Sequence, residues 1–196
     1  MYFWMVEKSR IGIDIVEEIK KFVEEECKKP TSKYGHEPFE FHFIPMVNYA
    51  KLLAKELNAD LEVVEIAGWL HDIGSIIYGR ENHHITGAEI AEKKLSELNY
   101  PAEKIKLVKK CILNHRGSRE DIRETIEEQI IADADAMSNF DNISGIFKAA
   151  FVFENQTQGE AKKSTLKKLK NKWNQLSDRS KELVRTKYDA VIILFS

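Results

Sequence analysis

Apolar residues recur at helical spacing along most of the chain, and no segment shows the alternation typical of a β-strand. The composition agrees, since helix formers dominate and the 196 residues include only four prolines and nine glycines. Helices are expected at about 10–29, 43–57, 61–73 and 87–98, after Pro101, after Thr125, and two or three times within 145–195. We therefore predict an all-α protein, a helical bundle of about seven or eight helices.

The bulk properties are those of a soluble globular protein and argue against several function classes. The chain is 43% hydrophobic and 32% charged with a formal net charge of -2, so it offers no general attraction for a nucleic acid polymer. No apolar run approaches the roughly 18 residues of a membrane span, and the apolar N-terminal stretch is too short for a signal peptide. Two cysteines without a framework are typical of a reducing compartment. We expect a cytoplasmic protein without a membrane partner, and leave a homodimer open.

Histidine and aspartate, residue types that commonly bind metals, occur mainly at or near the ends of the expected helices. His42 precedes the helix at 43–57, and His71-Asp72 falls in the last turn before Gly74, which we expect to end that helix. The remaining members are His83 and His84 in a loop before a capping pattern (Thr86, Glu89), His115 at a helix end, and Asp133 and Asp135 in the helix that a second capping pattern (Thr125, Glu128) opens. Imidazoles and carboxylates from several helices can converge on one ion at the end of a bundle.

The surroundings of the doublet support such a site. In the apolar segment IAGWLHDIG, burial of an isolated Asp72 carboxylate would be costly, and a bound cation or a partner histidine removes that cost. Adjacent side chains on a helix point about 100° apart, so His71 and Asp72 share an ion only if it lies near the helix end. Mixed imidazole and carboxylate ligands suit Mn, Fe, Co, Ni or Zn and suit Ca poorly.

The ordered set resembles the HD-domain superfamily of metal-dependent phosphohydrolases. The family pattern is a His, then a His-Asp doublet about one helix later, then a distant Asp. Here these correspond to His42 in FHFIPMVNYAKLLA, His71-Asp72 in IAGWLHDIG and Asp135 in IIADADAMSNF, and the HHITGAEIAEKKL and CILNHR segments also look like those of small stand-alone HD hydrolases. The resemblance implies one HD-type domain over 1–196, with its core at about 36–150 and the helices at 10–29 and 155–195 packed on it.

The family pattern assigns the metal ligands by position. The resemblance makes His42, His71, Asp72 and Asp135 the ligands of a divalent transition metal (Mn, Co, Ni, Fe or Zn, with Mg as an option), one or two ions per chain. Asp133 lies two residues from Asp135 on the same helix and therefore faces nearly the opposite way, which favours a hydrogen-bonded carboxylate.

The same resemblance suggests catalytic and substrate-binding residues. His83 (or His84) and His115 match histidines that hold a second metal, with Asp72 bridging, or that contact phosphate in single-metal members; we favour one tight metal. The implied reaction is metal-assisted hydrolysis of a small phosphorylated substrate, for which the candidate catalytic residues are Asp72, His83 and His115. Candidates for substrate binding are Arg80, His84 and Arg116, with Lys167 or Lys168 from a lysine-rich helix whose simpler interpretation is a solvated face.

Departures from the family narrow the substrate, and other functions stay open. Ser75 replaces a lysine often found three residues after the doublet, and the Glu-Asp pair of alarmone hydrolases and the Gly-Tyr-Pro motif of cyclic-dinucleotide phosphodiesterases are missing. The leading hypothesis is a phosphohydrolase acting on a nucleotide. The alternatives are an HD-type di-iron oxygenase, which the six-residue set His42, His71, Asp72, His83, His115 and Asp135 would satisfy, and a non-catalytic module that binds metal or nucleotide.

Overall fold

The computed structural model describes residues 14–117 and 122–195, and within these ranges it contains helices and no strand. The prediction of an all-α protein is therefore confirmed. The elements are α1 (Ile15–Lys28), the π-helical segment η1 (Phe39–Phe43), α2 (Ile44–Leu57), α3 (Leu61–Leu70), α4 (Ile73–Tyr78), α5 (His83–Glu97), α6 (Ala102–Asn114), α7 (Ile126–Ser138), α8 (Ile143–Lys148), the π-helical segment η3 (Ala149–Phe153), α9 (Gln158–Gln175) and α10 (Asp178–Phe195). The part of the expected first helix before residue 14 lies outside the described residues.

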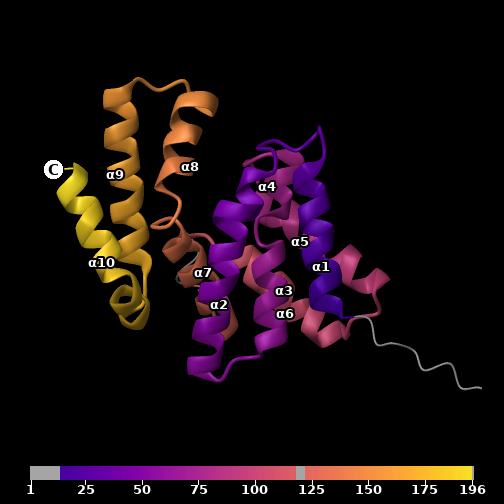
Figure 1. Ribbon diagram of the computed structural model, residues 1–196. Coiled ribbons are helices and arrows are strands. Elements are labelled where there is room, and N and C mark those ends of the chain that lie inside the picture. Colours follow the sequence, from indigo (N-terminus) through magenta and orange to yellow (C-terminus); the bar gives the residue numbers. More distant parts are fainter. Residues whose placement is uncertain (1–13, 118–121, 196) are drawn as a thin grey trace, which may run out of the picture.

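The helices form two groups that share α7. Helices α1 to α6 pack around α2 and α3 on one side of α7, and α8, α9 and α10 lie on its other side (Figure 1). Fully buried aliphatic side chains such as Leu53, Ile66 and Ile131 tie α2, α3 and α7 into one core. The second group joins this core through Leu169, Val184 and Val191, which are also buried. The cavity described below lies between the two groups and is lined by residues of both.

The chain breaks its helix at the doublet, three residues earlier than the sequence suggested. Helix α3 ends at Leu70, His71 and Asp72 form a turn, and α4 starts at Ile73, so Gly74 lies inside a helix and does not end one. This break is one reason why the described residues form more helices than the seven or eight expected: the single helix expected at 61–73 is divided into α3 and α4. Asp72 has φ −112° and ψ 12°, a non-helical conformation that turns its carboxylate away from the helical path.

Gly74 serves close packing. A Cβ on Gly74 would lie 2.4 Å from the backbone oxygen of His83, 2.4 Å from Oγ1 of Thr86 and 2.7 Å from the backbone nitrogen of Gly87. Only a residue without a side chain lets α4 and α5 approach this closely. The glycine after the doublet therefore sets the distance between Asp72 and the start of α5, which carries His83.

Helix α5 starts earlier than its predicted capping pattern. It begins at His83, after Asn82 in the left-handed conformation (φ 51°), so His83 and His84 lie in its first turn rather than in a loop. The Thr86 hydroxyl bonds to backbone oxygens of Asn82 and His83 and caps no helix, which corrects that prediction. Because the chain reaches α5 through a short turn, His83 stays close to the doublet.

Other predicted helix signals are confirmed. Thr125 and Glu128 form a reciprocal capping box at the start of α7, which carries Asp133 and Asp135. Helix α6 follows Pro101 and ends at Asn114, directly before His115. Within the described ranges, no helix is long and apolar enough to cross a membrane.

Replacement of Gly74 by alanine should destabilise the protein, because the new methyl group meets backbone atoms of α5 that cannot move alone. We expect Gly74→Ala to lower the free energy of unfolding by about 1–3 kcal/mol, measured by urea denaturation. Gly159→Ala in α9 is the matched control: nothing lies within 4 Å of its added Cβ. It should leave stability equal or slightly higher. Equal stability of Gly74→Ala and wild type would show that the close approach of α4 and α5 does not depend on a residue without a side chain at this position.

Candidate metal centre

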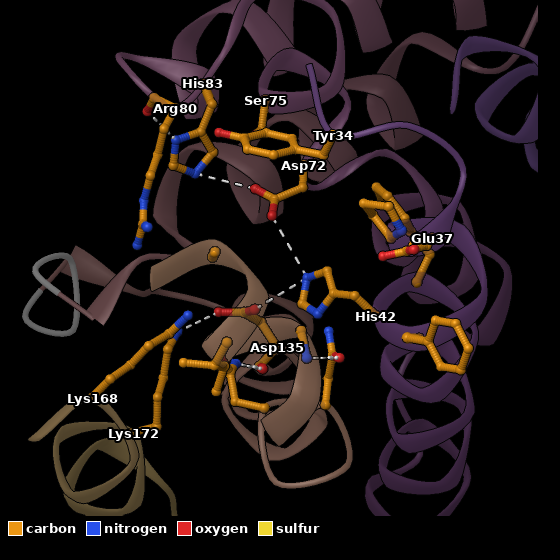
Figure 2. A pocket seen from close by; sticks show the side chains of 18 of the residues that line it. Tyr34, Glu37, His42, Asp72, Ser75, Arg80, His83, Asp135, Lys168 and Lys172 are labelled. Atoms are coloured by element: carbon orange, nitrogen blue, oxygen red, sulfur yellow. Dashed lines mark hydrogen bonds and ion pairs between the residues drawn. The ribbon is translucent and has the colours of Figure 1, made fainter. Parts of the chain in front are cut away.

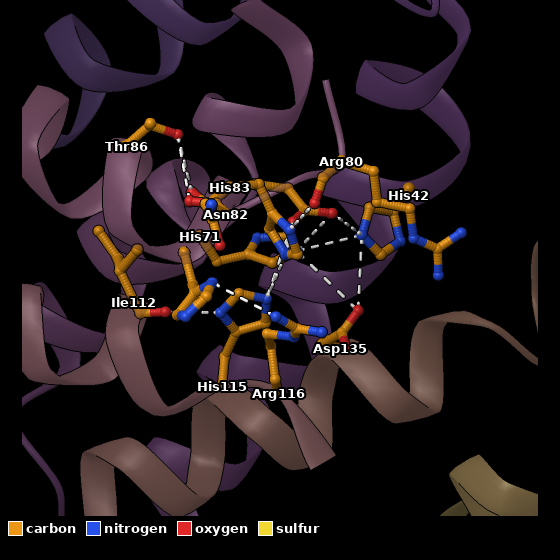
Figure 3. A network of polar contacts seen from close by, with 12 residues as sticks. His42, His71, Arg80, Asn82, His83, Thr86, Ile112, His115, Arg116 and Asp135 are labelled. Carbon is orange, nitrogen blue, oxygen red and sulfur yellow. Dashed lines mark hydrogen bonds and ion pairs between the residues drawn. The ribbon is translucent and has the colours of Figure 1, made fainter. Parts of the chain in front are cut away.

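Three of the four histidines around the doublet donate a hydrogen bond from Nδ1 to a backbone carbonyl. The Nδ1 atoms lie 2.8 Å from the Gly68 oxygen in His71, 2.8 Å from the Arg80 oxygen in His83 and 2.6 Å from the Ile112 oxygen in His115 (Figure 3). A carbonyl oxygen only accepts hydrogen bonds, so Nδ1 of each ring carries the proton. In the neutral ring, Nε2 then keeps a lone pair, and it points into the site.

His42 is held in the same tautomer by a hydroxyl. The Oγ atom of Ser138 lies 2.8 Å from the backbone oxygen of Asp135 and 3.0 Å from Nδ1 of His42. Because the hydroxyl donates its proton to the carbonyl, it accepts the hydrogen of His42 Nδ1. Nε2 of His42 is thereby also left as an acceptor.

The four Nε2 atoms meet in two close pairs. The distance is 3.1 Å between His42 and His71, and 3.3 Å between His83 and His115. Two lone pairs that face each other at this distance repel unless a proton or a cation lies close to both. Neutral imidazole is the commonest metal ligand in proteins. The donor set of this chain therefore fits a metal ion on its own chemistry.

Asp72 faces both pairs with different oxygens. Its Oδ2 lies 3.6 Å from Nε2 of His42 and 3.7 Å from Nε2 of His71. Its Oδ1 lies 3.2 Å from Nε2 of His83 and 3.7 Å from Nε2 of His115. His42, His71 and Asp72 form one group with the spacing of a metal site, and Asp72, His83 and His115 form a second. One carboxylate thus joins two adjacent candidate sites.

Asp135 completes the first group from α7. Its Oδ1 lies 3.6 Å from Nε2 of His42 and 4.0 Å from Nε2 of His71, and its Oδ2 pairs with Nζ of Lys172 at 2.6 Å (Figure 2). The first group can therefore offer an ion four protein ligands, and the second offers three. An ion with three protein ligands keeps a position open for water or substrate.

Burial and charge set the protonation of these groups. Burial lowers the pKa of His71, and burial lowers the pKa of His115 to about 4, so both rings are neutral at pH 7. Burial alone would raise the pKa of Asp72, but the imidazoles that face it, His71 first, hold that pKa well below its usual value. The pKa of Asp135 is also lowered, because Lys172 and then His42 outweigh its burial. Ionised carboxylates at Asp72 and Asp135 and neutral imidazoles at His71 and His115 are the forms in which these side chains bind a divalent cation.

A cavity of about 690 Å³ opens over these ligands, between the two helix groups. Arg80, Arg116, Lys168 and Lys172 line it, and Ser75 lies at its wall. Figure 2 shows Arg80, Lys168 and Lys172 on one side of His42 and Asp72, and Glu37 on the other. His84 does not line the cavity; it is buried, and its Nδ1 lies 3.5 Å from Nη1 of Arg116. Its position therefore suits support of Arg116 better than the direct contact with substrate that we expected.

Lys168 is a partly buried cation at the cavity wall. Among the described residues, none forms an ion pair with its Nζ, whereas Lys172 is paired with Asp135. Burial, and then the like charges of Lys172 and Arg80, lower the pKa of Lys168 to about 8. Of the two candidates in the lysine-rich helix, Lys168 lines the cavity and Lys167 is exposed to solvent. The helix is amphipathic, and Lys168 and Lys172 lie at the cavity rather than on its solvated face.

Asp133 has a structural role, in contrast to Asp135. Its carboxylate accepts hydrogen bonds from Gln129 (2.9 Å), from the backbone nitrogen and Oγ of Ser177 (3.3 and 2.5 Å) and from Oγ of Ser180 (2.7 Å). Ser177 directly precedes α10, so Asp133 fixes the junction of α9 and α10 on α7. The expectation of a hydrogen-bonded helix carboxylate is confirmed.

Sequence reasoning missed Lys172, Ser138 and the aromatic residues of the cavity wall. Lys172 lies four positions after Lys168, but six lysines in this helix offer many such spacings. Ser138 carries no signal at all until α7 places it beside His42. Tyr34, Phe41 and Phe153 line the cavity from segments that the sequence did not connect with the site.

The HD-domain family matches residues 40–139, which is more than half of the chain. The chain belongs to the HD-domain family. Its matched region includes His42, the doublet and Asp135, the residues that the resemblance assigned to the primary metal.

Solved structures agree in fold. Bacillus subtilis YpgQ, whose structure is in complex with ADP, has 19% sequence identity and a TM-score of 0.67 over 89% of this chain and 90% of its own. A Lactobacillus plantarum protein has 17% identity and a TM-score of 0.68 over 92% of each chain. A predicted HD superfamily hydrolase from an uncultured Thermotogales bacterium has 22% identity and a TM-score of 0.53 over 78% of this chain and 83% of its own. At these identities the likeness concerns the fold of this HD-domain protein.

Substitution of Asp133 should affect stability, and substitution of Asp135 should affect metal binding. Asp133→Ala should lower the free energy of unfolding by about 1–3 kcal/mol, because two hydroxyls and a backbone N–H lose their acceptor, and should leave the metal content unchanged. Asp135→Ala should reduce the metal content. Elemental analysis and urea denaturation of both variants measure these effects. Loss of metal in Asp133→Ala with retention in Asp135→Ala would reverse the assignment.

Proposed function

We propose that this protein is a metal-dependent phosphohydrolase that acts on a small phosphorylated metabolite, namely a nucleotide. The observation that carries the proposal is that one cavity contains both a metal-ligand cluster and a partly buried ammonium group, Lys168, which forms no ion pair with any described residue. A cluster of imidazoles and carboxylates suits a divalent ion, and a buried cation among like charges suits an anion such as phosphate.

The ligands for the ion follow from the geometry. His42, His71, Asp72 and Asp135 would hold the primary ion, and Asp72, His83 and His115 would hold a second, weaker one. Mn, Co, Ni, Fe or Zn would suit these donors. When bound, such an ion provides a nucleophilic water near neutral pH and polarises a phosphoryl oxygen.

The protein's own groups would bind and orient the substrate. Arg80, Arg116 and Lys168 bring positive charge to the cavity wall, where they would neutralise the charge of a phosphate group. Lys172 already neutralises one oxygen of Asp135, which leaves the other oxygen directed at the imidazoles. A carboxylate such as Asp72, with one oxygen toward each histidine pair, is placed to accept a proton during hydrolysis.

A nucleotide is favoured for two reasons. The cavity combines cations with aromatic side chains, which is the combination that phosphate and base require. In addition, YpgQ, which shares the fold, has been solved with ADP. The cations also favour a phosphorylated substrate over the alternative of a di-iron oxygenase.

Metal analysis combined with an activity screen tests the proposal. Purified protein should carry one or two transition-metal ions per chain and should release phosphate or pyrophosphate from members of a nucleotide panel with added Mn, Co, Ni or Mg. Asp72→Ala should lose both metal and activity, because it removes the ligand that the two groups share. Two irons per chain with oxygen consumption and no phosphate release would favour the oxygenase. Absence of metal and of turnover, in folded protein supplied with each ion, would refute the hydrolase.

The charge of Lys168 predicts how substrate binding depends on pH. Lys168 is positively charged below its pKa of about 8 and neutral above it, with Lys172 and Arg80 lowering that pKa and Asp135 and Asp72 opposing them. We expect KM for the phosphorylated substrate to rise by up to about 10-fold from pH 7 to pH 9. In Lys168→Arg the guanidinium stays charged throughout, so this rise should be absent. The same rise in both proteins would exclude Lys168 as its source.

A further inference from the structure

The wall of the cavity differs in chemistry from one part to another. Three of its cations, Arg80, Lys168 and Lys172, lie together on one side of the metal ligands (Figure 2). Elsewhere the wall carries aromatic rings, Tyr34 from the loop before η1 and Phe153 from the end of η3. The metal centre and the cations account for the binding of phosphate, but they leave these rings without a role.

Two contacts hold the aromatic part of the wall in place. The rings of Tyr34 and Phe153 meet edge to face, with centroids 5.2 Å apart and planes at 89°. Nζ of Lys148, the last residue of α8, and Oε2 of Glu37, in the loop before η1, form an ion pair at 2.6 Å. Because an edge-to-face contact uses only one ring face, flat ring surface remains free for a ligand.

Phe153 faces the cavity, unlike its equally exposed neighbour Phe151. Phe151, two residues earlier, is equally exposed (44% against 46%), but it stacks on Phe147 with centroids 5.8 Å apart and lines a separate hollow. The π-helical segment therefore turns Phe153, and not Phe151, toward the cavity. The exposed face of Phe153 at the cavity wall is therefore available to a flat, apolar part of a ligand.

We propose that Tyr34 and Phe153 form a platform on which the base of the nucleotide stacks while its phosphates lie at the metal centre and Lys168. This inference rests on the proposed function and assigns the residues that select a nucleotide over a base-free phosphoester. Stacking on an aromatic face accepts every base, because each base offers a flat ring system. The platform therefore distinguishes nucleotides from sugar phosphates and inorganic phosphates rather than one base from another.

Binding of two matched, non-hydrolysable compounds tests the platform. The α,β-methylene analogue of ADP and methylenediphosphonate carry the same phosphorus–carbon–phosphorus group, and only the first has a base. Isothermal titration of purified protein should show at least about 10-fold tighter binding of the nucleotide analogue. Phe153→Ala should weaken the binding of the nucleotide analogue about 10-fold and leave methylenediphosphonate unchanged. Phe153→Tyr should retain the affinity, because it keeps the flat ring.

Phe151→Ala is the matched control, since it removes an equally exposed ring from the same segment outside the cavity, and it should bind both compounds like wild type. Equal affinity of wild type for the two compounds, or of Phe153→Ala and wild type for the nucleotide analogue, would overturn the platform. Binding of neither compound would overturn it as well. The titration requires no turnover, so base-dependent binding through Phe153 without hydrolysis of any phosphoester would refute the hydrolase and sustain the platform.

Discussion

The structure of the site depends on hydrogen bonds from histidine Nδ1 atoms to the protein's own backbone. The carbonyl oxygens of Gly68, Arg80 and Ile112 each take the proton of one imidazole, and Ser138 takes that of His42. These bonds fix the tautomer and the orientation of every ring, so four lone pairs converge in a small volume. Such an arrangement is unfavourable without a cation and favourable with one. His71 and His115 are thus oriented by carbonyl groups of the helices that precede them, and His42 is oriented by Ser138 of α7.

The break between α3 and α4 allows the second group of candidate ligands, Asp72, His83 and His115, to form. If one helix continued through the doublet, Asp72 would keep a helical conformation and could not face both histidine pairs. The turn at His71 and Asp72 directs one oxygen to each pair, and Gly74 lets α5 approach closely enough to bring in His83. A local change of backbone direction is therefore what allows one carboxylate to serve two groups of ligands.

The sequence predicted what depends on local patterns. Helical periodicity gave the all-α class, and the ordered doublet, His42 and Asp135 gave the family. The misplaced boundaries at Gly74 and Thr86 have one cause: both residues match a common local signal, but tertiary packing between α4 and α5 uses them for close contact instead. Lys172, Phe153 and Ser138 were not predictable, because their importance comes only from the packing of α8 and α9 beside the metal ligands and from the position of α7. The choice between one and two metals was also beyond the sequence, since it depends on how the two oxygens of Asp72 point.

Anomalous X-ray scattering from crystals of the metal-loaded protein tests the central claim most directly. The account predicts a strong peak between His42, His71, Asp72 and Asp135, and a second, weaker peak between Asp72, His83 and His115. A strong peak elsewhere in the molecule, or none at this cluster in crystals grown with an excess of transition metal, would contradict it.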